Sequence, residues 1–153
     1  MKALITSMFA IALLSGCSLV RAWKSGVGPS DTIYAEGRLA ECPDEPNCIS
    51  TQSPRADHAI VPFTYSKPLE EARTALKAEM AQVPHATLIK EDGPYIHFEC
   101  RSSVLQLADD VEFLFNEESK TLQFRSASRF GFSDWGSNRK RMEELRNKIL
   151  GHI

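Results

Sequence analysis

The sequence has no hydrophobic run long enough to span a bilayer, no strong excess of either charge and no repeated or low-complexity block. Its 153 residues are 42% hydrophobic and 25% charged, and the formal net charge is −2. These values exclude a wholly disordered, collagen-like or polytopic membrane protein and favour one compact domain. The near-neutral charge provides no long-range field for phosphate backbones, so we expect no nucleic-acid partner.

Motifs of the common enzyme classes are also missing. The chain contains no nucleotide-binding loop, zinc-protease helix or Rossmann glycine pattern. The acidic residues between positions 109 and 112 lie too close together in sequence to define a two-carboxylate hydrolase or a metal cage. We therefore expect no cofactor and no metal. An enzyme would have to use His97, on the polar side of a strand, with a nearby carboxylate or serine. The serines considered, none of which lies in a nucleophile elbow, are Ser126, Ser128 and Ser133.

The N-terminus has the pattern of an export signal. Lys2 precedes an apolar run over residues 3–14, which has the length of a signal-peptide core and is too short to span a bilayer. The run ends in Leu14-Ser15-Gly16-Cys17, which resembles the bacterial lipobox. The resemblance implies removal of residues 1–16 and acylation of Cys17, which would anchor the mature chain to a membrane. Ser18 then implies sorting to the periplasmic face of the outer membrane in a Gram-negative cell. The alternatives are an ordinary secretory signal and an uncleaved anchor.

The exported part divides into a tether over residues 17–41 and one domain over residues 42–153. Glycine and proline interrupt the first segment, which shows no periodicity. Cys42 and Cys48 enclose five residues that include two prolines, and in an oxidising compartment we interpret them as a disulfide. Metal binding, with His58 nearby, is the alternative. Cys100 lies on the apolar side of a strand and is expected to be a free core thiol.

The remaining pattern predicts an α+β two-layer sandwich in the order β-α-β-β-β-β-α. We expect an antiparallel sheet of about five strands, with both helices on one face. The first helix follows Ser66, a plausible N-cap, and ends at Pro84; the second covers residues 137–150. The predicted strands span residues 60–63, 87–91, 95–101, 110–115 and 122–129.

Several motifs resemble the bacterial and plastid family known as domain of unknown function 1499, over nearly all of residues 40–150. They are Cys42-Pro43 with Pro46-Asn47-Cys48-Ile49-Ser50, Asp109-Asp110-Val111-Glu112-Phe113, Arg125-Ser126-Ala127-Ser128-Arg129 and Ser133-Asp134-x-Gly136-x-Asn138-Arg139-x-Arg141. The resemblance implies no established activity. Its members are often exported lipoproteins or membrane-attached domains.

The residues also suggest an arginine-bearing sheet face that binds an anionic small molecule, a lipid headgroup or an envelope protein. Its charges must be solvated or joined in ion pairs, because unpaired burial is costly. A purely structural or assembly role is the alternative, and Asp134 could simply cap the last helix. The candidate ligand-binding residues are Arg101, Arg125, Arg129, Ser133, Asp134, Asn138 and Arg139.

Overall fold

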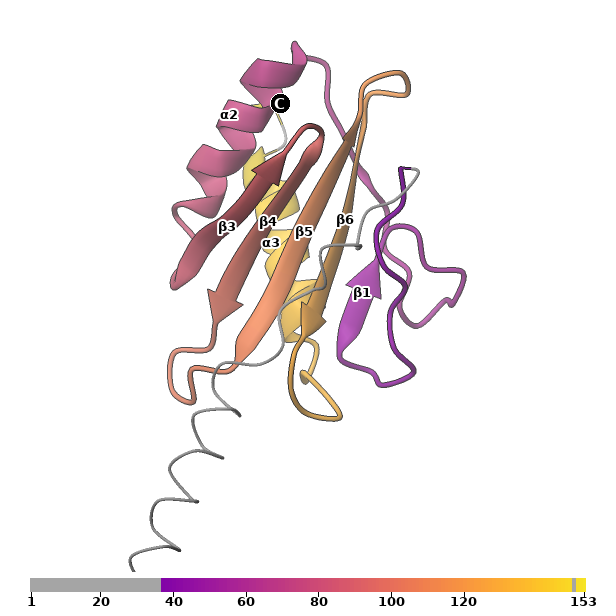
Figure 1. Ribbon diagram of the computed structural model, residues 1–153, viewed down its shortest axis with the longest axis vertical. Coiled ribbons are helices and arrows are strands. Elements are labelled where there is room, and N and C mark those ends of the chain that lie inside the picture. Colours follow the sequence, from indigo (N-terminus) through magenta and orange to yellow (C-terminus); the bar gives the residue numbers. More distant parts are fainter. Residues whose placement is uncertain (1–36, 150) are drawn as a thin grey trace, which may run out of the picture.

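The computed structural model describes residues 37–149 and 151–153, which form a sheet backed by two helices (Figure 1). All strand pairs in the sheet are antiparallel, and the main path runs β1-β6-β5-β4-β3, with β2 also paired to β6. The elements are β1 (Cys48–Ser50), β2 (Phe63–Thr64), α2 (Leu69–Met80), β3 (Ala86–Asp92), β4 (Tyr95–Arg101), β5 (Ala108–Asn116), β6 (Thr121–Ser128) and α3 (Ser137–Ile149). This is the predicted α+β sandwich.

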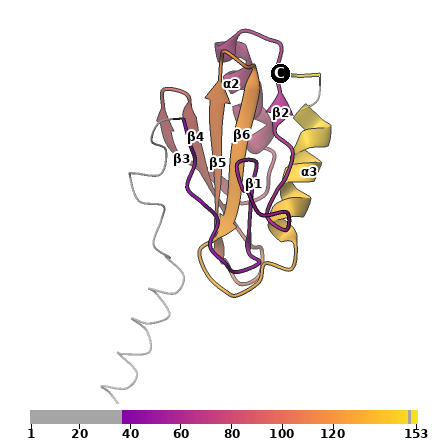
Figure 2. The ribbon, with the colours of Figure 1, turned by 90° about the vertical axis from the view of Figure 1, so that its right-hand side faces the viewer.

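Both helices lie against the same face of the sheet, as the two views show (Figures 1 and 2). The core between the layers is contiguous, and alternation along the strands supplies its sheet side. Its fully buried members include Phe113 and Phe124 from the sheet, Leu76 from α2 and Met142 from α3. Because elements from both ends of the described chain share this core, the described residues fold as one unit.

The helix boundaries agree with the sequence at α3 but differ at both ends of α2. Pro68, and not Ser66, is the N-cap residue of α2, and no side chain caps this end. Pro68 has the fixed backbone angle of a helix start, and Glu70 and Glu71 place negative charge in the first turn. The helix ends at Met80, shortly before Pro84, which has no backbone N–H to continue it.

The N-terminal part of the fold is more regular than the sequence suggests. Residues 48–50, for which no strand was predicted, pair with β6 as strand β1, with Cys48 opposite Ala127. Leu39 is buried against Tyr95 and Leu114, so ordered packing begins three residues before Cys42. The strand expected at residues 60–63 is β2, shifted to Phe63–Thr64 because Pro62 cannot donate to the ladder.

The connections divide between the two ends of the sheet. The β3–β4 turn, where Gly93 has a positive φ of 52°, and the β5–β6 turn lie at one end (Figure 1). The β4–β5 loop and the β6–α3 loop lie at the other end. Among the described residues, no helix is long and apolar enough to cross a membrane.

Candidate functional site

The face of the sheet away from the helices carries a network of polar side chains, here called the charged face. Its members are Tyr95, His97, Glu99, Arg101, Asp110, Glu112, Arg125 and Arg129. The strand register places Glu112 between His97 of β4 and Arg125 of β6. Arg125 Nη1 donates to Glu112 Oε2 at 2.8 Å, and the Tyr95 hydroxyl donates to Oε1 at 2.7 Å. Glu112 is thus held on both carboxylate oxygens.

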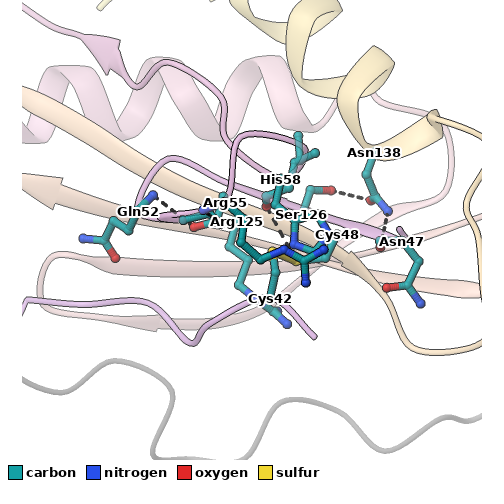
Figure 3. The surroundings of a disulfide bond; sticks show 12 residues. Cys42, Asn47, Cys48, Gln52, Arg55, His58, Arg125, Ser126 and Asn138 are labelled. Carbon is teal, nitrogen blue, oxygen red and sulfur yellow. Dashed lines mark hydrogen bonds between the residues drawn. A yellow bond between two sulfur atoms is a disulfide. The ribbon is translucent and has the colours of Figure 1, made fainter. Parts of the chain in front are cut away.

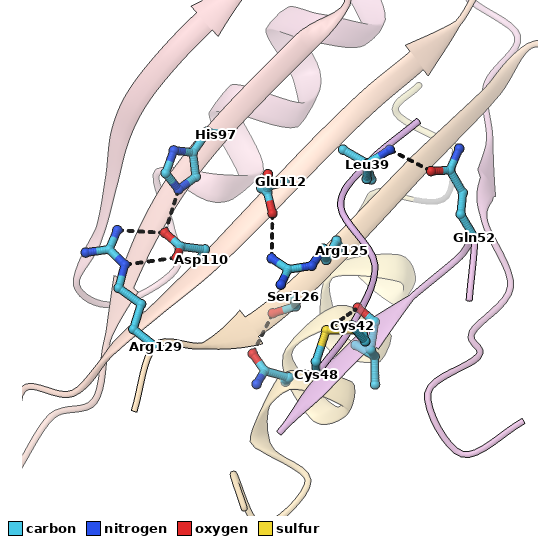
Figure 4. Close-up of polar contacts among 12 residues, drawn as sticks. Leu39, Cys42, Cys48, Gln52, His97, Asp110, Glu112, Arg125, Ser126 and Arg129 are labelled. Carbon is cyan, nitrogen blue, oxygen red and sulfur yellow. Dashed lines mark hydrogen bonds and ion pairs between the residues drawn. A yellow bond between two sulfur atoms is a disulfide. The ribbon is translucent and has the colours of Figure 1, made fainter. Parts of the chain in front are cut away.

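A second group of ion pairs centres on Arg129 (Figure 4). Its guanidinium donates to Asp110 from Nε at 2.9 Å and from Nη2 at 2.6 Å, and Nη1 donates to Glu99 at 2.7 Å. His97 Nε2 lies 2.7 Å from Asp110 Oδ1, and Arg101 Nε donates to Glu99 at 2.6 Å. Three arginines therefore face three carboxylates, and the charged face neutralises itself.

This face is buried at its centre, where Asp110 is 5% and Glu112 0% exposed. The sequence predicted that these charges are either solvated or joined in ion pairs, and the structure shows ion pairs. Burial alone would raise the pKa of Asp110, but hydrogen bonds from His97 and Arg129 and their charges outweigh burial and hold it below its ordinary value. Hydrogen bonding to Asp110 raises the pKa of Arg129. An anion approaching these arginines would compete with carboxylates already in place.

On the opposite side of the sheet, a group here called the α3 latch fastens the last helix. It consists of Asn47, Asp109, Ser126, Ser128, Asn138 and Arg141. Asn138 is fully buried. Its side chain accepts a hydrogen bond from the Ser126 hydroxyl at 2.6 Å and donates one to the Asn47 carbonyl at 3.0 Å (Figure 3). Arg141 forms an ion pair with Asp109 and also donates to Ser126. The predicted ligand residue Asn138 therefore joins helix, sheet and disulfide loop.

A cavity of about 290 Å³, here called the β1-edge pocket, opens where the N-terminus of α3 meets strand β1. Its lining residues are Pro46, Cys48, Ile49, Asp57, His58, Ser133, Asp134, Trp135, Gly136 and Arg139. Three of the predicted ligand residues, Ser133, Asp134 and Arg139, thus meet here, away from the charged face. His58 joins them from the loop that precedes β2.

His58 is the most unusual residue of the β1-edge pocket. It is 1% exposed, and neither ring nitrogen has a hydrogen-bond partner. Nε2 lies 3.7 Å from Asp57 Oδ2, too far for a hydrogen bond, and Arg55 already binds that carboxylate. A buried polar group without a partner costs roughly 1–3 kcal/mol. Both ring nitrogens are shielded from solvent, so a ligand in the pocket would offset this cost once the ring turns toward it.

The other charged residues of the β1-edge pocket differ in how fully they are engaged. Asp134 caps α3, because its carboxylate accepts the backbone N–H groups of Gly136 at 3.0 Å and Asn138 at 2.8 Å. Arg139 donates only from Nη2, to the carbonyls of Asp57 and Ala59, each at 3.0 Å. It pairs with no carboxylate in the described part of the chain. Its Nε and Nη1 groups are therefore available to an acceptor.

The structure separates His97 from the serines considered above. Ser126 and Ser128 point toward α3, where they belong to the latch, while His97 points to the charged face beside Asp110. Ser133 lines the β1-edge pocket with His58 instead. An enzyme based on His97 would therefore rely on Asp110, whose other partner is Arg129.

The cysteines in the described part of the chain are either paired in a disulfide or buried in the core. Cys42 and Cys48 form a disulfide, which confirms that pairing over metal binding (Figure 3). Cys100 is free and buried, as its alternation predicted, and burial raises the pKa of its thiol to about 11. No group of three or more side chains that could hold a metal ion occurs in residues 37–149 and 151–153. Cys17 and its lipobox lie outside the described residues.

Fold and site together define an α+β domain with a self-neutralised charged face and a small pocket at its sheet edge. Residues 38–149 match the family model described as "Protein of unknown function (DUF1499)", and the chain belongs to this family. No curated protein and no solved structure matches the chain significantly. Many of the motif residues that indicated the family lie in the latch, the charged face and the pocket, while Val111 and Phe113 lie in the core.

Sequence reasoning considered His58 only as a metal ligand near the two cysteines and did not predict its place in the β1-edge pocket. Nothing in its neighbourhood signals a buried imidazole, because half of the pocket is formed by residues 133–139, which follow His58 by 75 residues or more. Arg141, Asp109 and Glu112 were visible as motif residues, but their pairing depends on the register of β5 and β6.

Proposed function

We propose that the protein is a binding domain of the cell envelope, held at a membrane by a lipid on Cys17, with its ligand site in the β1-edge pocket. The ligand carries a carboxylate or phosphate group, as in an anionic small molecule or a lipid headgroup. The buried, unpartnered imidazole of His58 is the observation that carries this proposal. In either protonation state His58 keeps at least one N–H donor for such a group.

Arg139 favours an anion over a neutral ligand. Asp57 is neutralised by Arg55, and Asp134 is bonded to the amides of α3, whereas Arg139 has no carboxylate partner among the described residues. Its free N–H groups and the positive end of the α3 dipole act in the same direction. The proposed site therefore lies at the sheet edge and not on the charged face, where each arginine already has a carboxylate partner.

The test follows the imidazole signals of His58 by NMR during titration with inorganic phosphate, glycerol 3-phosphate and acetate. Binding in the millimolar range, about −4 kcal/mol, is expected for at least one of these small probes. Stronger binding of glycerol 3-phosphate than of phosphate would identify a headgroup as the ligand source. The reverse order would identify a free anion.

Two variants and one matched control complete the design. His58→Leu removes the imidazole donors and Arg139→Gln removes the guanidinium charge, so each should weaken binding about tenfold or more. Binding to the His58 variant is followed by the backbone amide signal of Gly136, which also lines the pocket. Arg146→Gln is the control, since Arg146 also lies on α3 and also donates to backbone carbonyls, those of Val61 and Pro62, outside the pocket. The proposal is overturned if no probe shifts the His58 signals at about 10 mM, or if all three variants bind alike.

A further inference from the structure

The β4–β5 and β6–α3 loops expose apolar side chains at one end of the sheet. Four of them, here called the apolar tip, are Val104, Leu105, Phe132 and Trp135, with exposures of 89%, 55%, 75% and 95%. Five of the eight large hydrophobic side chains that are exposed in the described part of the chain lie in these two loops. This concentration is more than the scattered surface residues of an ordinary domain.

The two loops leave the sheet side by side and are braced. Asp109 is opposite Ser128 where the loops meet the strands, and the Arg129 amide donates to the Ala108 carbonyl at 3.0 Å. Gln106 and Trp135 both have positive φ, 56° and 55°, which non-glycine residues adopt at a cost. The Trp135 amide donates to the Ser133 hydroxyl at 3.2 Å, and the Trp135 side chain is exposed to solvent.

The distribution of charge gives the molecule two unlike ends. Residues 102–107 and 130–136 contain a single charged side chain, Asp134, whose carboxylate already accepts the backbone N–H groups of Gly136 and Asn138. At the opposite end Asp92 is the last residue of β3, and the β5–β6 turn contains Glu117, Glu118 and Lys120. Desolvating the apolar tip is thus inexpensive, whereas desolvating the other end would bury several carboxylates.

We propose that the apolar tip inserts into the interfacial region of a lipid bilayer and so orients the domain on the membrane. Tryptophan and phenylalanine are favoured at that depth. A protein partner would need a surface complementary in shape to two separate loops. Lipid is fluid and can pack around each side chain individually. The inference goes beyond lipid anchoring, because it assigns a second membrane contact and states which end of the domain faces the lipid.

The chain before the domain is long enough for this orientation. Gly37 lies near Pro94 and Asn116, at the acidic end. The 20 links from Cys17 to Gly37 (37 − 17) reach at most about 70 Å, and the nine residues of β5 span about 30 Å. A lipid on Cys17 would therefore let the tip reach the bilayer. This step rests on the proposed function, but the test below does not.

The test uses the chain of residues 18–153, which keeps every described residue and lacks both the lipid and the apolar run. Trp23→Phe leaves Trp135 as the single tryptophan. With vesicles of phosphatidylethanolamine and phosphatidylglycerol, we expect a blue shift of Trp135 emission and co-sedimentation that persists in high salt. Phe132→Ser with Trp135→Ser should weaken co-sedimentation about tenfold or more, because two aromatic rings no longer leave water.

Val61→Ser is the matched control, because Val61 is 70% exposed but lies outside both loops. Val104→Asp tests the second loop independently and should also weaken binding, while urea unfolding checks that each variant is folded. Unchanged co-sedimentation of the Phe132 and Trp135 variant overturns the proposal, as does binding that high salt abolishes. Tip-dependent dimers in place of vesicle binding would overturn it as well, and would assign the surface to a second copy of the chain.

Discussion

Replacing Glu112 by glutamine removes the carboxylate that faces Arg125 inside the charged face. Glu112 is fully buried and is held by Arg125 at 2.8 Å and Tyr95 at 2.7 Å. Breaking a buried ion pair on one side costs about 3–5 kcal/mol. The Arg125 side chain retains 12% exposure, so we expect the lower limit, about 3 kcal/mol. That is a large share of the 5–15 kcal/mol typical of a domain.

The change is measured by urea unfolding followed by circular dichroism, and the melting temperature should fall by roughly 10 °C. Lys140→Gln is the control, because it breaks a 4.0 Å pair with Glu144 that is exposed on both sides, and should cost less than about 0.5 kcal/mol. Glu112→Leu combined with Arg125→Met should recover most of the stability, since an apolar pair needs no counter-charge. A cost below about 1 kcal/mol for Glu112→Gln, or no recovery in the double variant, would refute the reasoning.

The pKa of Asp110 is held below its ordinary value of about 3.9. Its contribution to stability is therefore present above about pH 4 and is lost as the pH falls through the folded-state pKa. Asp110→Asn should flatten this acid dependence in unfolding curves measured from pH 5 downward, and an unchanged slope would contradict the assignment. The thiol of Cys100, with its pKa raised to about 11, should resist iodoacetamide at pH 8 in the folded Cys17→Ser protein and react in urea. Equal labelling in both states would show that the site is open.

Alternation predicted the strands from β3 to β6 well, because each pairs with its neighbour in sequence through a short connection. It also placed Glu99, Asp110, Glu112 and Arg125 on one face. It could not predict that this face is buried, because burial depends on which distant segments cover it. The register then decides which carboxylate each arginine meets.

The parts that the sequence did not predict depend on distant partners. Strand β1 has only three residues and exists because β6, 79 residues later (127 − 48), pairs with it. The pocket around His58 depends on α3, through the bonds from Arg139 to the Asp57 and Ala59 carbonyls. Local sequence patterns carry no information about contacts between segments this far apart in the chain.

The bond between Asn138 and the Asn47 carbonyl has a consequence for the order in which the domain is completed. The two residues are 91 positions apart, and synthesis proceeds at about 5–20 residues per second. The segment around Asn47 therefore waits roughly 5–20 s for its partner. Strands β3 to β6 can pair as they emerge, and β1 can join once β6 is present, whereas the bond from Asn138 and the β1-edge pocket can form only once α3 is present. The Cys42–Cys48 disulfide needs no distant partner, so in an oxidising compartment it can form before this long-range contact.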